Sequence, residues 1–315
     1  MDVNRRTVEI RVGGRYRLGK KIGSGSYGEI YEGSDIFSGE DVAIKLEHLS
    51  NPTHYLLHEA KLMKSISSTY FPDMHWYGSA GEYNCMVMKL LGQNLEDLYD
   101  FCARNFTLKT IIMIAIETID RLKYFHENHY IHCDIKPQNL LVSKDNSDNS
   151  IYLIDYGSSR RFRDDQTRIH ISYKENRLLT GTARYASRNA HMGIEQTRRD
   201  DLESFGYVLL YFLKGSLPWQ GLKIKDKLEK YEKIKEIKNG YTSNELFKGF
   251  PQEFINYMEY CYNLKFEEEP KYTDINNNFK ELLKAKDYEL DYTYDWITVV
   301  SCLLYIIFCV LLEKQ

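Results

Sequence analysis

The sequence predicts an α+β chain in which a small strand-rich lobe is followed by a larger helical lobe. Strand-like runs at Arg15–Ile22, Glu29–Ser34 and Asp41–Glu47 are separated by turns that contain glycine. From Leu95 onward, apolar residues recur instead at the spacing of buried helix faces. The chain has 315 residues, of which 43% are hydrophobic, and this is enough for one large core or two joined ones.

Each lobe contains further predicted elements. In the small lobe, residues 53–66 have helical spacing and residues 84–90 form an apolar strand, so this lobe ends at about residue 91. In the larger lobe, the pattern predicts helices at residues 95–104, 108–128, 200–213, 223–238, 251–264 and 273–286. The helix at 223–238 is highly charged, which predicts a face in contact with solvent.

Composition argues against several classes of protein. The net charge is −3 with 28% charged residues, which gives no general reason to expect nucleic acid or an anionic membrane surface as a partner. The six cysteines include no C-x-x-C pair and predict the reduced thiols of a cytoplasmic protein. Residues 1–11 are polar and lack an apolar stretch, so no secretory signal is expected.

A glycine-rich turn lies between the first two predicted strands. Gly23, Gly25 and Gly28 match G-x-G-x-x-G, a weak signal that an ordinary turn would also explain. The dinucleotide-binding version of this motif opens a helix, whereas Glu29–Tyr31 continues here as a strand. A flexible hairpin over phosphate groups is therefore the better interpretation.

The next predicted strand carries a lysine in the apolar run Val42–Lys45. Side chains alternate along a strand, so the small Ala43 leaves room for a flat base and Lys45 lies further along the same face. Glu59, on the predicted helix that follows, is the natural partner to hold Lys45 against the α- and β-phosphates of a nucleotide. Taken singly, the two residues are more simply a surface lysine and a solvated glutamate.

Two later motifs supply the remaining groups that phosphoryl transfer needs. His132–Asn139 matches H-x-D-x-K-x-x-N. In this pattern Asp134 would orient and deprotonate an acceptor hydroxyl, and Lys136 would neutralise charge on the γ-phosphoryl group. Asn139, and Asp155 of the following D-Y-G motif, would bind Mg²⁺ through oxygen. Four separated motifs in the expected order make coincidence a poor explanation, and they predict ATP and Mg²⁺ as cofactors.

Further stretches of the larger lobe have a distinctive sequence. They are Leu95–Leu98, Gly181–Ser187, Gly193–Gln196, Arg199–Ser204 and Leu217–Leu222. This combination, with Ser187-Arg188-Asn189 in place of the usual A-P-E, resembles the casein kinase I family of Ser/Thr protein kinases. The resemblance covers residues 16–296, so residues 1–15 are an N-terminal extension and residues 297–315 an additional apolar tail.

The resemblance implies a bilobal eukaryotic protein kinase fold, with a β-rich N-lobe at about residues 16–91 and an α-helical C-lobe at about residues 92–296. It implies that Asp201 braces the catalytic loop, that Met88 is the gatekeeper, and that the backbone of Leu91 meets adenine. The implied ATP-binding residues are Ile22, Gly23, Ser24, Gly25, Gly28, Ile30, Ala43, Lys45, Glu59, Met88 and Leu91.

A few positions depart from the usual kinase pattern. Cys133 replaces the arginine that in many kinases grips a phosphorylated activation loop, so we expect activity to need no such phosphate. A buried, inert thiol is the simpler expectation for Cys133 than a redox-sensitive one. Tyr156, Lys89 and Arg188 also differ, but none removes a group that the chemistry requires. An active protein kinase is therefore expected over a pseudokinase scaffold or a small-molecule kinase.

Basic residues gather between Asp155 and Ser187, in a chain that is otherwise near neutral. The family resemblance places Arg184 and Lys230, with Arg177 nearby, at a pocket for an acidic or phosphorylated group of the substrate. The expected partners are therefore proteins with acidic or pre-phosphorylated Ser/Thr sites. A solvated basic loop is the alternative.

The C-terminal tail is apolar and carries no charge from Trp296 to Leu312. A helix of this length spans about 26 Å at roughly 1.5 Å per residue, which is near the lower limit for a bilayer core. A membrane tail anchor, with the remaining chain facing the cytosol, is one expectation. A helix packed on the larger lobe and an aberrant terminus from a faulty gene model are the alternatives.

Overall fold

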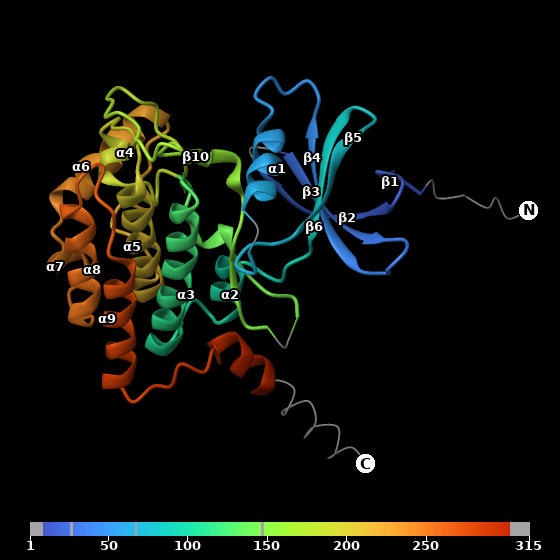
Figure 1. Ribbon diagram of the computed structural model, residues 1–315. Coiled ribbons are helices and arrows are strands. Elements are labelled where there is room, and N and C mark those ends of the chain that lie inside the picture. Colours follow the sequence, from blue (N-terminus) through green and yellow to red (C-terminus); the bar gives the residue numbers. More distant parts are fainter. Residues whose placement is uncertain (1–8, 26–27, 67, 146–147, 303–315) are drawn as a thin grey trace, which may run out of the picture. The chain divides into compact units, whose positions relative to one another are not determined.

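The computed structural model describes residues 9–25, 28–66, 68–145 and 148–302. The chain divides into two compact units. Unit 1 comprises residues 1–92 together with Ile154–Gly157, and unit 2 comprises Gln93–Leu153 together with residues 158–315. Unit 1 is rich in strands and unit 2 is mainly helical, which confirms the α+β fold that the sequence predicts (Figure 1).

Unit 1 is built on an antiparallel sheet of six strands in the order β1-β2-β3-β4-β6-β5. The strands are β1 Arg11–Val12, β2 Tyr16–Gly25, β3 Gly28–Asp35, β4 Asp41–His48, β5 Met74–Ala80 and β6 Tyr83–Lys89. One helix, α1 (Tyr55–Ser65), follows β4 and packs against β5 and β6. Strand β5 has no counterpart in the sequence prediction because only part of its side chains is buried, which obscures the alternation.

The core of unit 1 lies along β4 and β6. Val42, Ile44 and Leu46 of β4 pack with Cys85 and Val87 of β6, and all of them are buried. These side chains alternate with Ala43 and Lys45, which are also buried. Strand β4 is therefore covered on both faces, and the face that carries the lysine is the functional one.

Unit 2 consists of helices with three short strand pairs or single turns between them. The helices are α2 Leu95–Phe101, α3 Leu108–Glu127, α4 Arg188–His191, α5 Arg198–Lys214, α6 Lys227–Gly240, α7 Ser243–Leu246, α8 Gln252–Asn263 and α9 Tyr272–Ala285. The strands are β7 Tyr130–Ile131 paired with β10 Arg160–Arg161, and β8 Leu140–Val142 paired with β9 Ile151–Leu153. Two 3₁₀ turns, η1 Pro137–Asn139 and η2 Tyr156–Ser158, begin within the predicted functional motifs.

Helices α3 and α5 form the centre of unit 2. Helix α3 packs against α5 and α9, and α5 packs against α8 (Figure 1). The side chain of Thr107 accepts a hydrogen bond from the backbone of Thr110 and so caps the start of α3. Thr197 and Asp200 form a capping box at the start of α5, and Gly215 ends that helix in the left-handed conformation, with φ of 79°.

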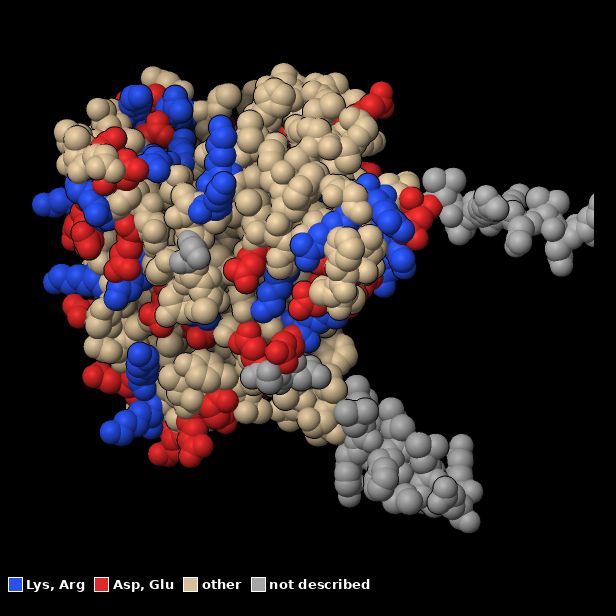
Figure 2. Space-filling view, turned by 45° about the vertical axis from the view of Figure 1, so that its right-hand side comes forward, with Lys and Arg blue, Asp and Glu red and all other residues tan. Residues whose placement is uncertain are grey.

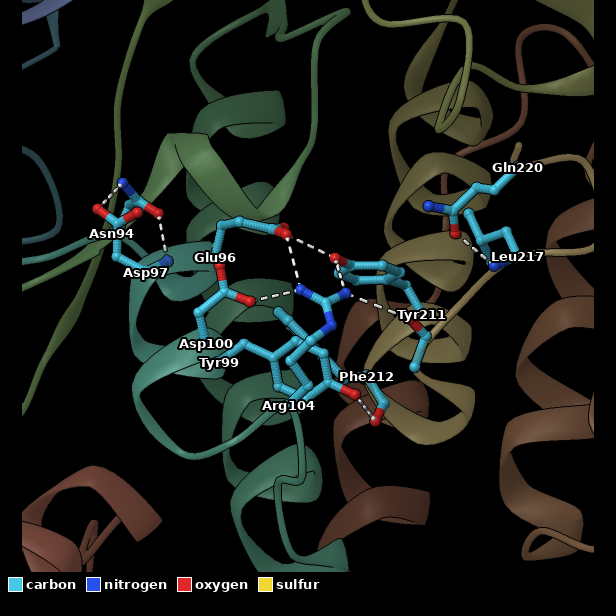
Figure 3. A network of polar contacts seen from close by, with 11 residues as sticks. Asn94, Glu96, Asp97, Tyr99, Asp100, Arg104, Tyr211, Phe212, Leu217 and Gln220 are labelled. Carbon is cyan, nitrogen blue, oxygen red and sulfur yellow. Dashed lines mark hydrogen bonds and ion pairs between the residues drawn. The ribbon is translucent and has the colours of Figure 1, made fainter. Parts of the chain in front are cut away.

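A network of polar contacts joins α2 to α5 (Figure 3). The guanidinium of Arg104 donates to Asp100 at 2.5 Å and to the hydroxyl of Tyr211, and that hydroxyl donates to Glu96 at 2.5 Å. The sequence predicted a helix as far as Arg104, but α2 ends at Phe101. The reason is that Ala103 and Arg104 adopt positive φ angles of 53° and 57°, which directs Arg104 back toward α2.

Helix α6 differs from the predicted solvent-facing helix in one important residue. Ile234 and Lys238, one helical turn apart, are both buried. The prediction of a charged, solvated face therefore fails at Lys238, since a helix-spacing pattern does not show that a lysine can be covered when backbone carbonyls meet its ammonium group.

The apolar tail lies largely outside the described residues. Residues 295–302 are helical, with Trp296 buried and Val300 and Cys302 exposed. Residues 303–312, on which the predicted membrane anchor depends, are not among those described. Among the described residues, no helix combines the length and apolar character needed to span a bilayer.

Candidate active site

The glycine-rich turn of unit 1 joins two paired strands. Gly23 and Gly25 end β2, and Gly28 begins β3, so a strand rather than a helix follows the turn. Gly28 has a φ of 139°, and a Cβ atom there would lie only 2.1 Å from the carbonyl oxygen of Leu46. Only glycine meets both conditions, which explains the last glycine of the motif in terms of backbone geometry.

Lys45 is the centre of a buried ionic contact in unit 1. Its ammonium nitrogen lies 2.7 Å from Glu59 Oε2 and 3.0 Å from Asp155 Oδ1. The Lys45 and Glu59 side chains are only 6% and 2% exposed. Burial by itself would lower the pKa of Lys45, but the two carboxylates outweigh it and raise that pKa above its ordinary value. Lys45 is therefore a fixed cation at neutral pH.

Glu59 also receives the backbone of the segment that carries Asp155. The backbone N–H of Tyr156 donates to Glu59 Oε1 at 3.3 Å, and the ring of Tyr156 packs edge-on against Phe71. Asp155 itself has a φ of 65°, in the left-handed region that costs a non-glycine residue free energy. Because the side chain of Asp155 is 24% exposed, its carboxylate meets both the buried lysine and solvent.

The other predicted nucleotide-binding residues of unit 1 lie on the same strands and turn. Ala43 pairs in register with Met88 across β4 and β6; Ala43 is buried and Met88 is partly buried. Leu91 and Ile30 are partly buried, and Ile22 is 46% exposed. This leaves apolar surface near the small Ala43, the kind of lining that suits the face of a purine ring.

Unit 2 holds Asp134 in a fully organised setting. Its Oδ1 accepts hydrogen bonds of 2.8 Å from both the backbone N–H and the hydroxyl of Thr182. Its Oδ2 accepts from the ammonium group of Lys136 at 2.5 Å, and Lys136 also lies 3.4 Å from the Thr182 hydroxyl. Asp134 is therefore held as a carboxylate with a fixed orientation and a cation beside it.

Asn139 is oriented by the backbone of the same loop. Its side-chain amide donates to the carbonyl oxygen of Asp134 at 2.9 Å, and the residue is 4% exposed. This contact uses the NH₂ group, so the amide oxygen is the atom directed away from the loop. An amide oxygen is the kind of hard ligand that Mg²⁺ accepts.

Asp201 of α5 supports the backbone just before Asp134. Its carboxylate accepts from the N–H groups of His132 and Cys133 at 2.7 Å and 2.8 Å, and from His126 Nε2 at 2.9 Å. Burial would raise the pKa of Asp201, but the hydrogen bond from His126 and the backbone donors lower it overall. Cys133 has a φ of 67°, so this brace stabilises a strained conformation.

Comparison with known protein families decides the identity of this chain. The model of the protein kinase domain matches residues 16–279. The chain belongs to the protein kinase family.

The kinase contains the donor set that MgATP requires. Protein kinases hold Mg²⁺ through an aspartate and an asparagine and the phosphates through a lysine. Asp155, Asn139 and Lys45 provide a carboxylate, an amide oxygen and a buried cation of these kinds. The residues present therefore fit the cofactors that the family uses.

The thiol of Cys133 in this kinase is buried, and burial raises its pKa well above the ordinary value. Because thiol reactivity depends on the thiolate, an inert side chain is the result. Arg160 lies beside it and donates to Glu195 at 2.7 Å.

The predicted anion-binding residues of the kinase are in different settings. Arg177 Nε donates to Glu195 Oε2 at 2.9 Å, so an internal carboxylate joins Arg177 and Arg160. Arg184 lies over the ring of Tyr185, and Lys230 is partly buried in α6. Among the residues that the structure describes, neither Arg184 nor Lys230 forms an ion pair, and no contact brings the three basic residues together.

Sequence reasoning missed three residues that position the site. Thr182 contacts Asp134, His126 contacts Asp201, and Lys238 donates to the carbonyl oxygens of Ala183, at 3.1 Å, and Ala186. Gly181, before Thr182, has a φ of 86°, and a Cβ there would lie 2.2 Å from the carbonyl oxygen of Cys133. The adjacent glycine was the available signal for Thr182, whereas His126 and Lys238 offer none in a single sequence.

Proposed function

We propose that this protein kinase is a Ser/Thr kinase of the casein kinase I type, which transfers the γ-phosphoryl group of MgATP to protein hydroxyls. The observation that carries the proposal is the setting of Asp134. A carboxylate that accepts two hydrogen bonds from Thr182 and one from Lys136 is pre-oriented to receive an acceptor hydroxyl. The family-like motifs between Leu95 and Leu222 support the casein kinase I assignment.

On the nucleotide side, unit 1 supplies a cation and its support. Lys45 would bind the α- and β-phosphates, and its contact with Glu59 keeps the ammonium group in place. The other proposed nucleotide-binding residues line β2, β3, β4 and β6 and the end of unit 1. Mg²⁺, when bound to Asp155 and Asn139, would neutralise phosphate charge.

On the acceptor side, unit 2 supplies the carboxylate and a second cation. Asp134 would accept a hydrogen bond from the Ser or Thr hydroxyl and take its proton as the phosphoryl group is transferred. Lys136, 2.5 Å from the same carboxylate, would stabilise the charge on the transferring group. The brace from Asp201 keeps this loop fixed, so little reorganisation is needed during the reaction.

We propose a preference for acidic or pre-phosphorylated sites, for which Arg184 and Lys230 would provide unpaired positive charge. Arg177 is 48% exposed and bonds Glu195 through Nε, so the rest of its guanidinium can meet a substrate anion. The activation segment itself needs no phosphate in this proposal, because Glu195 already neutralises Arg160 and Arg177. We further propose a cytoplasmic location, with residues 297–312 as a membrane anchor.

A phosphate-transfer assay with casein tests the proposal. Purified full-length chain with Mg²⁺ and radiolabelled ATP should label casein on Ser and Thr, and Asp134→Asn should lower the rate by about 100-fold or more. A peptide with acidic residues before the serine should be labelled faster than its uncharged counterpart. Both proteins should bind ATP alike and have the same unfolding midpoint.

Two results would contradict the proposal. Label on Tyr alone would refute the Ser/Thr assignment. Binding of ATP without transfer to any protein would instead support a scaffold that lacks catalysis.

A further inference from the structure

A group of cationic side chains surrounds His129 in unit 2. The His129 cluster consists of His129 with Arg161, Arg163 and Arg168. Arg163 Nε donates to His129 Nδ1 at 2.8 Å, and Arg168 Nη1 lies 2.9 Å from Nε2 and 3.2 Å from Nδ1 of the same ring. Arg161 extends beside them from β10 and donates to the hydroxyl of Tyr130 at 3.1 Å. The proposed phosphoryl transfer uses none of these side chains.

The loop that carries the arginines is organised by its own backbone. Asp164 N–H donates to the carbonyl of Ile169 at 3.0 Å, and Arg168 N–H donates to the carbonyl of Asp164 at 3.1 Å. The Asp164 carboxylate also accepts from the backbone of Gln166 and from the backbone and hydroxyl of Thr167. Arg163 and Arg168 are therefore directed to one ring by a closed loop, which reduces the entropy lost when they bind a ligand.

The positive charge in the His129 cluster is incompletely balanced. Asp165 pairs with Arg161 at 3.0 Å, but over the described part of the chain no carboxylate contacts Arg163 or Arg168. Burial, and then the nearby arginines, lower the pKa of His129, so its ring is neutral near pH 7. A neutral imidazole has a single acceptor lone pair and cannot accept from both guanidinium groups.

The two guanidinium groups are accessible. Arg168 is exposed and Arg163 is partly buried, so a ligand can approach from solvent. Each group presents a planar fork of donors, and two such forks match the several oxygens and double charge of a phosphate monoester better than a single carboxylate. The net charge of −3, and the mixture of acidic and basic residues on the face in Figure 2, argue against nucleic acid or an anionic membrane.

We propose that the His129 cluster binds the phosphate group of a phosphorylated peptide, with Arg163 and Arg168 as its main ligands and Arg161 at its edge. The site is separate in sequence from Arg177, Arg184 and Lys230. It would let the kinase retain a phosphorylated protein through contacts that the transfer reaction does not use. The inference does not depend on whether the kinase acts on Ser, Thr or Tyr.

The histidine ring provides a local probe for this site. Full-length protein with isotope-labelled histidine is titrated with a short phosphoserine peptide, the unphosphorylated peptide, or inorganic phosphate, and NMR follows the ring signals. The His129 signals are assigned by their loss in His129→Gln. The phosphoserine peptide should shift them saturably, whereas the unphosphorylated peptide should not.

Matched variants test the role of the arginines. Arg168→Gln and Arg163→Gln should each weaken the peptide response at His129 by about 10-fold or more, and Lys248→Gln, an exposed lysine of equal charge outside the cluster, should not. Arg168 is exposed, so its variant should keep the wild-type unfolding midpoint and casein activity even if the Arg163 variant folds poorly.

Three results would overturn the proposal. The first is an unshifted His129 signal at saturating peptide, and the second is an equal response in wild type and Arg168→Gln. In the third, inorganic phosphate would bind as tightly as the peptide, which would assign the site to the free ion.

Discussion

At the scale of single residues, the site depends on polar groups that are buried and fully oriented. Lys45 and Asp134 each contact two oppositely charged or hydrogen-bonding partners. Cys133 and Asp155, next to or within these contacts, have φ angles of 67° and 65°. Strain of this kind persists only where surrounding contacts determine the backbone, and here the carboxylates of Asp201 and Glu59 each accept a backbone N–H close to the strained residue.

His191 gives a pH-dependent prediction at this scale. Its Nε2–H donates to the carbonyl of Ala183 at 3.0 Å. Burial, and then the charge of Lys238, lower the pKa of His191 from 6.5 to about 3. A base with a lowered folded pKa stabilises the fold above its unfolded pKa, and this contribution is lost as pH falls from 6.5 toward 3. His191→Gln keeps a donor for Ala183 but removes the titration.

Urea unfolding at pH 7.5 and pH 5.0 measures this contribution. We expect wild type to lose about 2 kcal/mol more than His191→Gln over this interval, because about 1.5 pH units of proton uptake separate the two proteins. Exposed His75→Gln is the matched control and should behave as wild type. The same pH slope in wild type and His191→Gln would show that the ring is protonated without cost.

At the scale of elements, internal contacts hold the segment between Asp155 and α5. Glu195 joins Arg160 of β10 to Arg177, while the backbone N–H of Arg177 donates to the carbonyl of Gly193 at 2.8 Å. Lys238 of α6 fixes Ala183 and Ala186 from another side. These connections place Thr182 against Asp134, so α6 and β10 influence the site without contacting substrate.

Glu195 therefore takes the part that a phosphate plays in many kinases, and this predicts the response to two treatments. Phosphatase treatment of the purified kinase should leave its rate unchanged. Glu195→Gln should lower the rate several-fold and the unfolding free energy by about 1–3 kcal/mol, because two arginines lose their counter-charge. Exposed Glu289→Gln should change neither quantity. A collapse in rate after phosphatase treatment would show that a phosphate is required.

At the scale of the whole molecule, local patterns predicted the fold better than they predicted the supports of the site. The alternation along β4 and the apolar stripe of α3 are properties of neighbouring residues, and the α+β fold follows from them. Thr182 is 48 residues from Asp134, and His126 is 75 residues from Asp201. Which polar residue meets which depends on how distant segments pack, and a single sequence does not encode this in any local spacing.

The tail yields the last prediction at the scale of the whole molecule. Trp296 packs against Phe106 in unit 2, but Val300 and Cys302 are exposed, so the described part of the tail is only partly covered by the helical unit. If residues 297–312 insert into a bilayer, charge at their centre should prevent it, since an arginine costs about 2.5–3.5 kcal/mol at the middle of a membrane helix. The full chain should therefore float with phospholipid vesicles, whereas Ile306→Arg combined with Ile307→Arg should remain in the soluble fraction with unchanged casein activity. Flotation of both proteins, or of neither, would rule out an anchor formed by this segment.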